Sequence, residues 1–200
     1  MKNIEYYLSP SSPWTYLGHQ RLVAIAARHQ ASIEVLPVDL GGSIFPGSGG
    51  LPLAKRAPQR QAYRLVELRR WSAFLQVPLN LQPKHFPTPG HEAAKLIILA
   101  GQRHGQEAAL RMSHAVMHGL WAQEQDIGDL ATLARLADGC GLPGEKLVAD
   151  LALAEETYAA NTRRAIDAEV FGAPWYRYRD EPFWGQDRLD FLDRALAEPT

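Results

Sequence analysis

The residues best suited to chemistry stand together near the amino terminus, in Ser12-Pro13-Trp14-Thr15. This run follows an apolar segment and has the composition of a helix start, because Ser is a preferred N-cap and Pro is tolerated in the first turn. The free N–H groups and the dipole at such an end stabilise an anion, a thiolate among them. The run contains no cysteine, so a thiolate held there must come from another molecule. Capping alone is the simpler interpretation of Ser12.

Two groups near the carboxyl end are further candidates. Ala173 is a small residue placed before Pro174, where a late strand is predicted to open. Cis bonds are only about 5–6% of all X–Pro bonds, so this pair by itself does not predict one. Gln186 and Asp187 precede the last predicted helix, and Asp187 stands where an N-cap belongs. Their amide and carboxylate could also bind an amino group together.

Metal and disulfide chemistry are not expected. His114 and His118 are four residues apart on a predicted helix and could share a face, but no His-Glu-x-x-His motif and no third ligand accompany them. Cys140 is the only cysteine, which excludes an intramolecular disulfide and a cysteine-based metal cluster. We expect His85, before Phe86-Pro87, to shape a loop over the pocket and not to act as a base.

The composition is that of a soluble globular protein large enough to bury a full core. Of its 200 residues 46% are hydrophobic, and 21 basic against 22 acidic residues give a net charge of −1. The basic residues form no block, which argues against a nucleic-acid partner. Residues 1–8 lack the apolar core of a signal peptide, and no stretch approaches the roughly 20 apolar residues of a membrane span. We therefore expect a cytoplasmic protein without a membrane partner.

Hydrophobic periodicity predicts a strand–helix–strand opening. The first strand is expected over residues 4–9, the helix from 13 to about 29, and the second strand over 32–38. Two strands joined by such a crossover are parallel, and the connection is nearly always right-handed. Segment 41–50 holds five glycines and a proline, and it is predicted to be a mobile loop.

Helices dominate the middle of the chain and strands return near its end. Apolar residues at three- and four-residue spacing predict helices over 93–104, 107–121, 127–137 and 151–168. A strand is predicted over 174–178, a turn over 179–182, then Phe183-Trp184 and a last helix over 187–196. This order predicts an α/β protein with a thioredoxin-like fold and an inserted α-helical domain. The thioredoxin-like domain would comprise residues 1–52 and 165–200, and the insert residues 53–164.

Four large aromatic residues could line a substrate cleft between the insert and the thioredoxin-like half. They are Trp71, Phe74, Trp121 and Trp184. At helical spacing such residues more often belong to the core.

Six segments occur in the order of a known family over almost the whole chain. They are Ser12-Pro13-Trp14-Thr15-Tyr16-Leu17-Gly18, Leu40-Gly41-Gly42-Ser43-Ile44-Phe45, His85-Phe86-Pro87, Trp121 with Asp126-Ile127, Phe171-Gly172-Ala173-Pro174 and Phe183-Trp184-Gly185-Gln186-Asp187-Arg188-Leu189. In these segments the chain resembles the 2-hydroxychromene-2-carboxylate isomerase family. That family is a glutathione-dependent branch of the DsbA-like superfamily, related to kappa-class glutathione transferases.

The resemblance implies a cis bond before Pro174, a homodimer, and glutathione as the cofactor. Ser12 would be catalytic and would hold the glutathione sulfur where thioredoxin-like oxidoreductases carry the first cysteine of Cys-Pro-x-Cys. That thiolate would add reversibly to an unsaturated aromatic keto acid, the small-molecule substrate. The residues implied to bind glutathione are Ser12, Pro13, Trp14, Ala173 and Pro174, with Gln186 and Asp187 on the γ-glutamyl group.

Two positions depart from the family pattern. Ser9 replaces an acidic residue, and Gly50 replaces an Asn whose amide would lie near the sulfur. A charge-assisted hydrogen bond of this kind is worth about 1–3 kcal/mol, so we expect weaker glutathione binding. A kappa-like glutathione transferase and a non-catalytic thioredoxin-like binding protein remain alternatives. A thiol–disulfide oxidoreductase is nearly excluded, because Cys140 lies far from the motif and has no partner.

Overall fold

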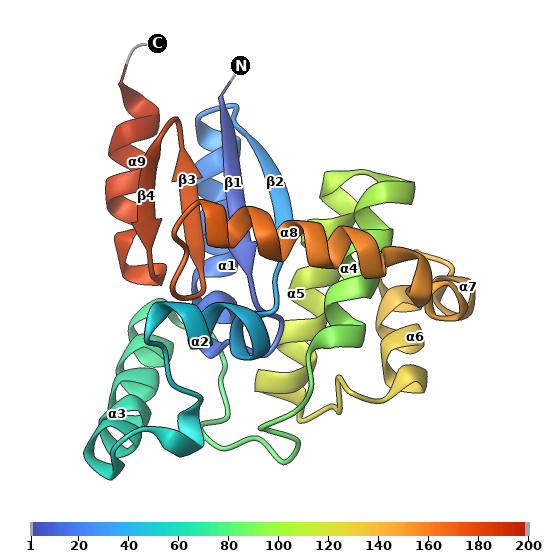
Figure 1. Ribbon diagram of the computed structural model, residues 1–200, viewed down its shortest axis with the longest axis horizontal. Coiled ribbons are helices and arrows are strands. Elements are labelled where there is room, and N and C mark those ends of the chain that lie inside the picture. The colour runs from blue at the N-terminus through green and yellow to red at the C-terminus, as the bar shows by residue number, and fades with distance from the viewer. Residues whose placement is uncertain (1, 199–200) are drawn as a thin grey trace.

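The computed structural model describes residues 2–198, which form a four-stranded sheet covered by helices (Figure 1). The strands are β1 (Asn3–Leu8), β2 (Ser32–Pro37), β3 (Trp175–Tyr178) and β4 (Glu181–Trp184), in the spatial order β2-β1-β3-β4. β2 runs parallel to β1, as the crossover predicts, and β3 is antiparallel to both β1 and β4. The thioredoxin-like fold with a helical insertion is confirmed.

Nine α-helices occur among the described residues, and each is labelled in Figure 1. They are α1 (Pro13–Arg28), α2 (Phe45–Ser48), α3 (Pro58–Leu75), α4 (His91–His104), α5 (Gln106–Gln123), α6 (Leu130–Gly139), α7 (Gly144–Ala149), α8 (Glu155–Asp167) and α9 (Leu189–Ala197). Short turns of other helix types are η1 (Leu40–Ile44), η2 (Leu53–Lys55), η3 (Leu151–Ala154) and η4 (Gln186–Arg188).

Alternation along β1 buries side chains on both faces of the sheet, as expected for a central strand. Ile4, Tyr6 and Leu8 belong to the larger core, which also includes Leu22 of α1 and Trp121 of α5. The helices of the predicted insert therefore share a hydrophobic core with the sheet. On the other face, where α8 crosses the sheet in Figure 1, Tyr7 belongs to a second cluster with residues of α8 and β3.

The prediction of a mobile loop over 41–50 is wrong, because most of that segment is helical. η1 and α2 occupy residues 40–48. The Asp39 carboxylate accepts hydrogen bonds from the Gly42 N–H at 2.9 Å and from the Ser43 hydroxyl at 2.8 Å, which satisfies groups at the start of the helix. Ile44 is buried in the second core cluster. One cap and one buried side chain thus order a glycine-rich stretch.

Two predicted helices have different bounds in the structure. The helix expected over 127–137 begins at Leu130, because Asp129 is its N-cap and accepts the Thr132 N–H at 2.8 Å. The helix expected over 151–168 is divided into η3 and α8. The predicted domain boundary at 164/165 lies inside α8. Within residues 2–198, none of the helices combines the length and apolar character needed to cross a bilayer.

Arg164 of α8 joins two strands of the sheet through their carboxylates. Its guanidinium lies 2.7 Å from Glu5 of β1 and 2.7 Å from Glu34 of β2, and Glu5 also accepts the Tyr7 hydroxyl at 2.7 Å. Burial alone would raise the pKa of Glu5, but the hydrogen bonds from Arg164 and Tyr7 and the charges of Arg164 and Arg177 more than offset it, so this pKa lies below its usual 4.5.

A depressed carboxyl pKa makes the fold sensitive to acid. The stabilisation is complete above the unfolded-state pKa of about 4.3 and is lost as the pH falls through the lower folded-state pKa. We expect Arg164→Met to move acid unfolding, followed by circular dichroism, to a higher pH. Arg163→Met is the control, since no ion pair to Arg163 is found among the described residues. Equal midpoints for the two variants would contradict this role of Arg164.

Candidate functional site

Ser12 is the N-cap of α1, as its sequence context predicts. Its backbone is extended, with φ −83° and ψ 121°, and its Oγ accepts the Thr15 N–H at 3.2 Å. Pro13 opens the helix, and no acidic residue occurs in its first turn. The positive end of the helix dipole is therefore not neutralised by its own side chains. Ser12 and Pro13 are buried, whereas Trp14 is half-buried.

The backbone before Pro174 lies directly against this helix start. The Ser12 hydroxyl donates a hydrogen bond to the carbonyl oxygen of Ala173 at 3.3 Å, although 161 positions separate the two residues. The Ala173-Pro174 bond is cis, as the resemblance implies. Three of the predicted site residues therefore meet at one point between α1 and β3.

Gln186 and Asp187, the remaining predicted site residues, follow Gly185 in the chain. The Gly185 N–H donates a hydrogen bond to the Pro174 carbonyl oxygen at 2.9 Å, which places this turn at the same end of the sheet. Gln186 is buried, and Arg21 of α1 donates to its side-chain oxygen at 3.3 Å and to its backbone oxygen at 3.2 Å. Asp187 is partly exposed and pairs with Arg188 at 2.6 Å. It lies inside η4 and does not cap α9. Of the two residues, Asp187 is the one that presents its side chain outward.

Arg21 is a site residue that the sequence did not predict. Its hydrogen bond to Gln186 fixes the turn that carries Asp187, but the two residues are 165 positions apart and no local sequence pattern indicates the contact.

Gly18 marks a close approach between α1 and this turn. A Cβ at position 18 would stand 2.8 Å from the Gln186 Cβ and 2.9 Å from the Tyr176 hydroxyl oxygen. We expect Gly18→Ala to lower the free energy of unfolding in urea by about 1–3 kcal/mol, because the contact is overpacked. Gly47→Ala in α2, where nothing lies within 4 Å of the added Cβ, is the control and should be neutral or stabilising. A higher free energy of unfolding for Gly18→Ala would show that Gln186 and Tyr176 leave room for a methyl group at position 18.

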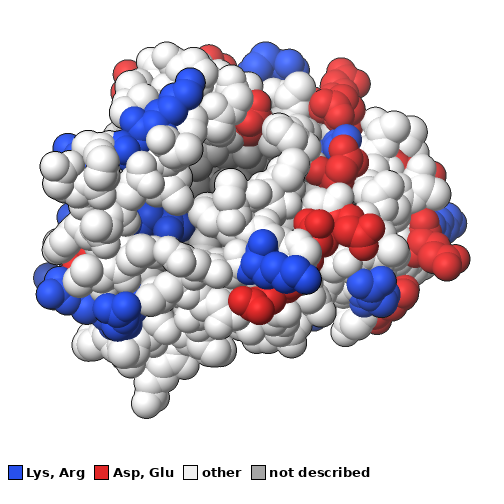
Figure 2. Space-filling view, turned by 90° about the horizontal axis from the view of Figure 1, so that it is seen from below, with Lys and Arg blue, Asp and Glu red and all other residues white. Residues whose placement is uncertain are grey.

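A small cavity lies beside the loop between β1 and α1. Its volume is about 190 Å³, and Ser9, Ser11, Asp39 and His91 are among its lining residues. In Figure 1 the chain descends along β1 and enters α1 at the lower end of the sheet. Figure 2 looks onto that end of the molecule and shows its surface hollowed, with basic side chains on the side of α3.

The two departures from the family pattern have different surroundings. Ser9 lies with its Oγ 3.4 Å from the Ser11 Oγ. At Gly50 an added Cβ would collide with the Phe45 ring, whose Cγ would be only 2.7 Å away. The ring of Phe45 thus occupies the direction that a side chain at position 50 would take, which explains why glycine is needed there.

The loop before α4 borders the helix start from another side. An added Cβ at Gly90 would lie 3.7 Å from the Ser11 Oγ. Further back in this loop, His85 lies 3.6 Å from the Asp126 carboxylate, which also accepts the Thr88 hydroxyl at 3.3 Å. Phe86 packs on Trp121 with ring centroids 4.8 Å apart. These contacts are consistent with the expectation that His85 shapes the loop.

The four aromatic candidates do not share one environment. Trp121 is fully buried in the core, whereas Phe74 is 77% exposed and Trp184 is 52% exposed. Trp71 contacts Phe74 edge-on at 5.7 Å.

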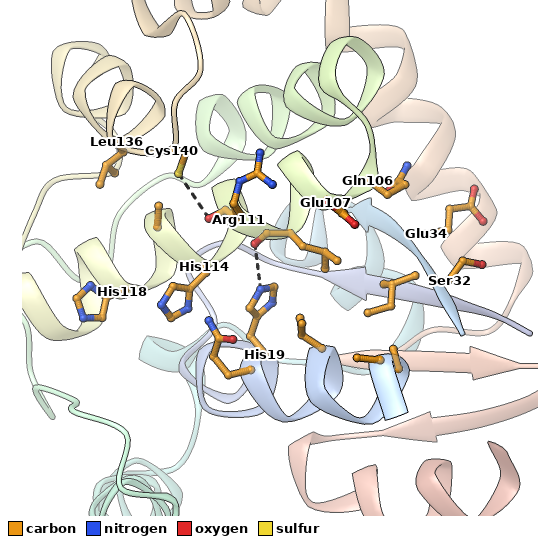
Figure 3. Close-up of a pocket in the computed structure, with 18 of the residues that line it drawn as sticks. His19, Ser32, Glu34, Gln106, Glu107, Arg111, His114, His118, Leu136 and Cys140 are labelled. Carbon is orange, nitrogen blue, oxygen red and sulfur yellow. Dashed lines mark hydrogen bonds between the residues drawn. The ribbon is translucent and has the colours of Figure 1, made fainter. Parts of the chain in front are cut away.

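A groove larger than the cavity beside Ser9 lies elsewhere, between α1, β2 and α5, and Ser12 is not among its lining residues. Its volume is about 1200 Å³, and the rings of His19, His114 and His118 follow one another along it (Figure 3). Burial, and then the charge of His114, lower the pKa of His19 to about 4, so its imidazole is neutral at physiological pH. Among the residues that the structure describes, no three His, Cys, Asp or Glu side chains are grouped to hold a metal ion.

Comparison with known proteins agrees with the motifs. Residues 3–197 match the family of DsbA-like thioredoxin domains. A 2-hydroxychromene-2-carboxylate isomerase of Sphingobium xenophagum is 29% identical over 199 residues, which are 98% of this chain and 99% of that protein. A protein of the same name from Pseudomonas putida is 26% identical over 203 residues, which are 97% of this chain and 94% of that protein.

A solved structure gives the same picture. The selenomethionine form of a 2-hydroxychromene-2-carboxylate isomerase superposes with a TM-score of 0.84 at 24% identity, covering 97% of this chain and 94% of that one. The resemblance predicted from the motifs is therefore confirmed over nearly the full length. Together with the match over residues 3–197, it shows that the chain belongs to the family of DsbA-like thioredoxin domains.

Proposed function

We propose that this protein is a glutathione-dependent isomerase of the 2-hydroxychromene-2-carboxylate isomerase type. The observation that carries the proposal is the Ser12 hydroxyl at the start of α1, 3.3 Å from the carbonyl oxygen of Ala173 and beside the cis bond to Pro174. The name shared by the two relatives supports an isomerase.

The residues at this point fit a sulfur anion. The first turn of α1 offers free N–H groups and no acidic residue, and Ser12 adds a hydroxyl that can donate one hydrogen bond. When bound, glutathione would supply a thiolate that adds reversibly to a conjugated double bond, so that this bond can rotate before the thiolate leaves. Ser12 would turn its hydroxyl from the Ala173 carbonyl toward the sulfur and, with the helix dipole, hold the negative charge there.

The remaining groups would orient the tripeptide. The Asp187 carboxylate is partly exposed and would bind the α-amino group of the γ-glutamyl residue. Arg21 and buried Gln186 would keep the Asp187 turn in place against α1. The backbone at Ala173 and Pro174 would pair with the extended tripeptide.

Calorimetric titration with glutathione tests the binding step. Saturable binding at millimolar concentration or below is expected, and its absence would overturn the proposal. Isomerisation of 2-hydroxychromene-2-carboxylate, followed by absorbance, should then require glutathione. S-methylglutathione, which keeps the tripeptide but has no free thiol, should bind without supporting the reaction.

The position of the Phe45 ring beside Gly50 favours a second candidate, a binding protein without catalytic activity, because a side-chain amide at position 50 would collide with that ring and could not assist the sulfur. Product analysis separates the candidates. Isomerised substrate with glutathione recovered unchanged indicates the isomerase. Accumulation of a glutathione conjugate indicates a kappa-like transferase, and binding without either product indicates the binding protein.

A further inference from the structure

The guanidinium of Arg64, on α3, makes cation–π contacts with two aromatic rings. Its guanidinium carbon lies 5.3 Å from the centroid of the Phe86 ring and 5.7 Å from that of Trp121. Phe86 comes from the loop before α4, Trp121 is fully buried on α5, and their rings are in contact with each other. The guanidinium therefore rests on an apolar wall built by two elements distant in sequence from α3.

This cation has no anionic partner within residues 2–198. No carboxylate pairs with Arg64, and none of its five N–H groups donates a hydrogen bond there. Its neighbours Arg56 and Arg60 have no carboxylate partner in the same range either. Burial and then the charge of Arg56 lower the pKa of Arg64 to about 10, which leaves the group charged at neutral pH. A half-buried cation without a partner favours the binding of an anion from outside the chain.

The position of this wall relates it to the helix start. Phe86 and Gly90 belong to one loop, and Gly90 lies beside Ser11. Four residues of chain span at most about 14 Å, which limits how far the Phe86 backbone lies from that of Gly90. α3 contacts α1, and the basic side chains in Figure 2 border the hollow on the side of α3.

We propose that Arg64 binds the carboxylate of the electrophilic substrate, while Phe86 supports the aromatic ring of the same molecule. The inference rests on the proposed function, since it names the residue that would hold the carboxylate of that reaction's substrate. A guanidinium offers a planar pair of donors that matches a carboxylate, and the site holds this pair ready on the two rings. Arg64 would thus determine specificity and would take no part in bond making.

Binding of trans-cinnamate and of its neutral analogue trans-cinnamamide to the full chain without glutathione tests this directly. The wild-type protein is expected to prefer the carboxylate by about tenfold or more, and Arg64→Met should abolish the preference. Arg64→Lys, which keeps the charge without the planar pair of donors, should retain part of it. Arg69→Met, an exposed residue on the same helix, is the matched control and should behave as wild type. A preference unchanged in Arg64→Met would overturn the proposal.

Kinetics with glutathione separate this inference from the proposed function. Arg64→Met should raise the KM for 2-hydroxychromene-2-carboxylate while leaving the affinity for glutathione unchanged. If the wild-type protein does not bind glutathione, the proposed function is overturned and the inference is not, because the preference for cinnamate is measured without glutathione. Intact isomerisation with an unchanged KM in Arg64→Met would sink the inference alone. Unfolding midpoints of both Arg64 variants establish that each is folded under the assay conditions.

Discussion

Ser12→Ala is expected to reduce kcat/KM of the glutathione-dependent isomerisation by about 100-fold or more, because removal of one preorganised donor to a developing anion typically costs about 10²–10³. The Ser12 hydroxyl is buried at the start of α1 and donates a hydrogen bond to the Ala173 carbonyl oxygen at 3.3 Å. Without it, the N–H groups and the dipole of the helix would remain, so the loss should be large but incomplete.

The pH profile distinguishes this role from a merely structural one. Loss of the hydroxyl should raise the pKa of the bound thiol, so the activity of Ser12→Ala should recover as the pH rises. Ser11→Ala is the matched control, because it removes a neighbouring hydroxyl that contacts Ser9 and not Ala173. Activity of Ser12→Ala within about threefold of wild type at neutral pH would contradict anion stabilisation by this residue.

Trp121→Ala is expected to lower the free energy of unfolding by about 3–5 kcal/mol, which is typical for truncation of a large buried aromatic side chain. Trp121 is fully buried in the core that joins the sheet to the inserted helices, and it packs on Phe86. Its carbonyl also accepts the Asn80 N–H at 2.7 Å, a backbone bond that the substitution leaves in place. The cavity left by the indole would therefore account for the loss.

Thermal and urea unfolding measure this effect. For a chain of this length each kcal/mol shifts the melting temperature by about 2–4 °C, so a decrease of about 10 °C is expected. Phe74→Ala is the control, since that ring is 77% exposed on α3 and should change stability by no more than about 0.5 kcal/mol. A change below about 1 kcal/mol for Trp121→Ala would show that the core closes over the missing ring.

The strands and helices were predicted from rules that use only neighbouring residues, such as hydrophobic periodicity and helix capping. The short, aromatic-rich apolar run over residues 4–9 and the Ser-Pro helix start can be recognised from a few neighbouring residues, so β1 and α1 were predicted nearly at their observed bounds. For segment 41–50 the same rules gave a wrong prediction, because a high glycine content indicates a loop. That content contains no information on the cap formed by the Asp39 carboxylate or on the burial of Ile44.

The sequence by itself determined the order of strands and helices, the cap at Ser12 and the lack of an internal disulfide. Only the tertiary structure decided which side chains meet. In the folded chain Ser12 forms a hydrogen bond with Ala173, 161 positions away, and Arg21 forms one with Gln186. The Arg64 guanidinium lies over the rings of Phe86 and Trp121. The reason is physical: capping and periodicity act over a few residues, whereas contacts between distant elements depend on how their apolar faces pack.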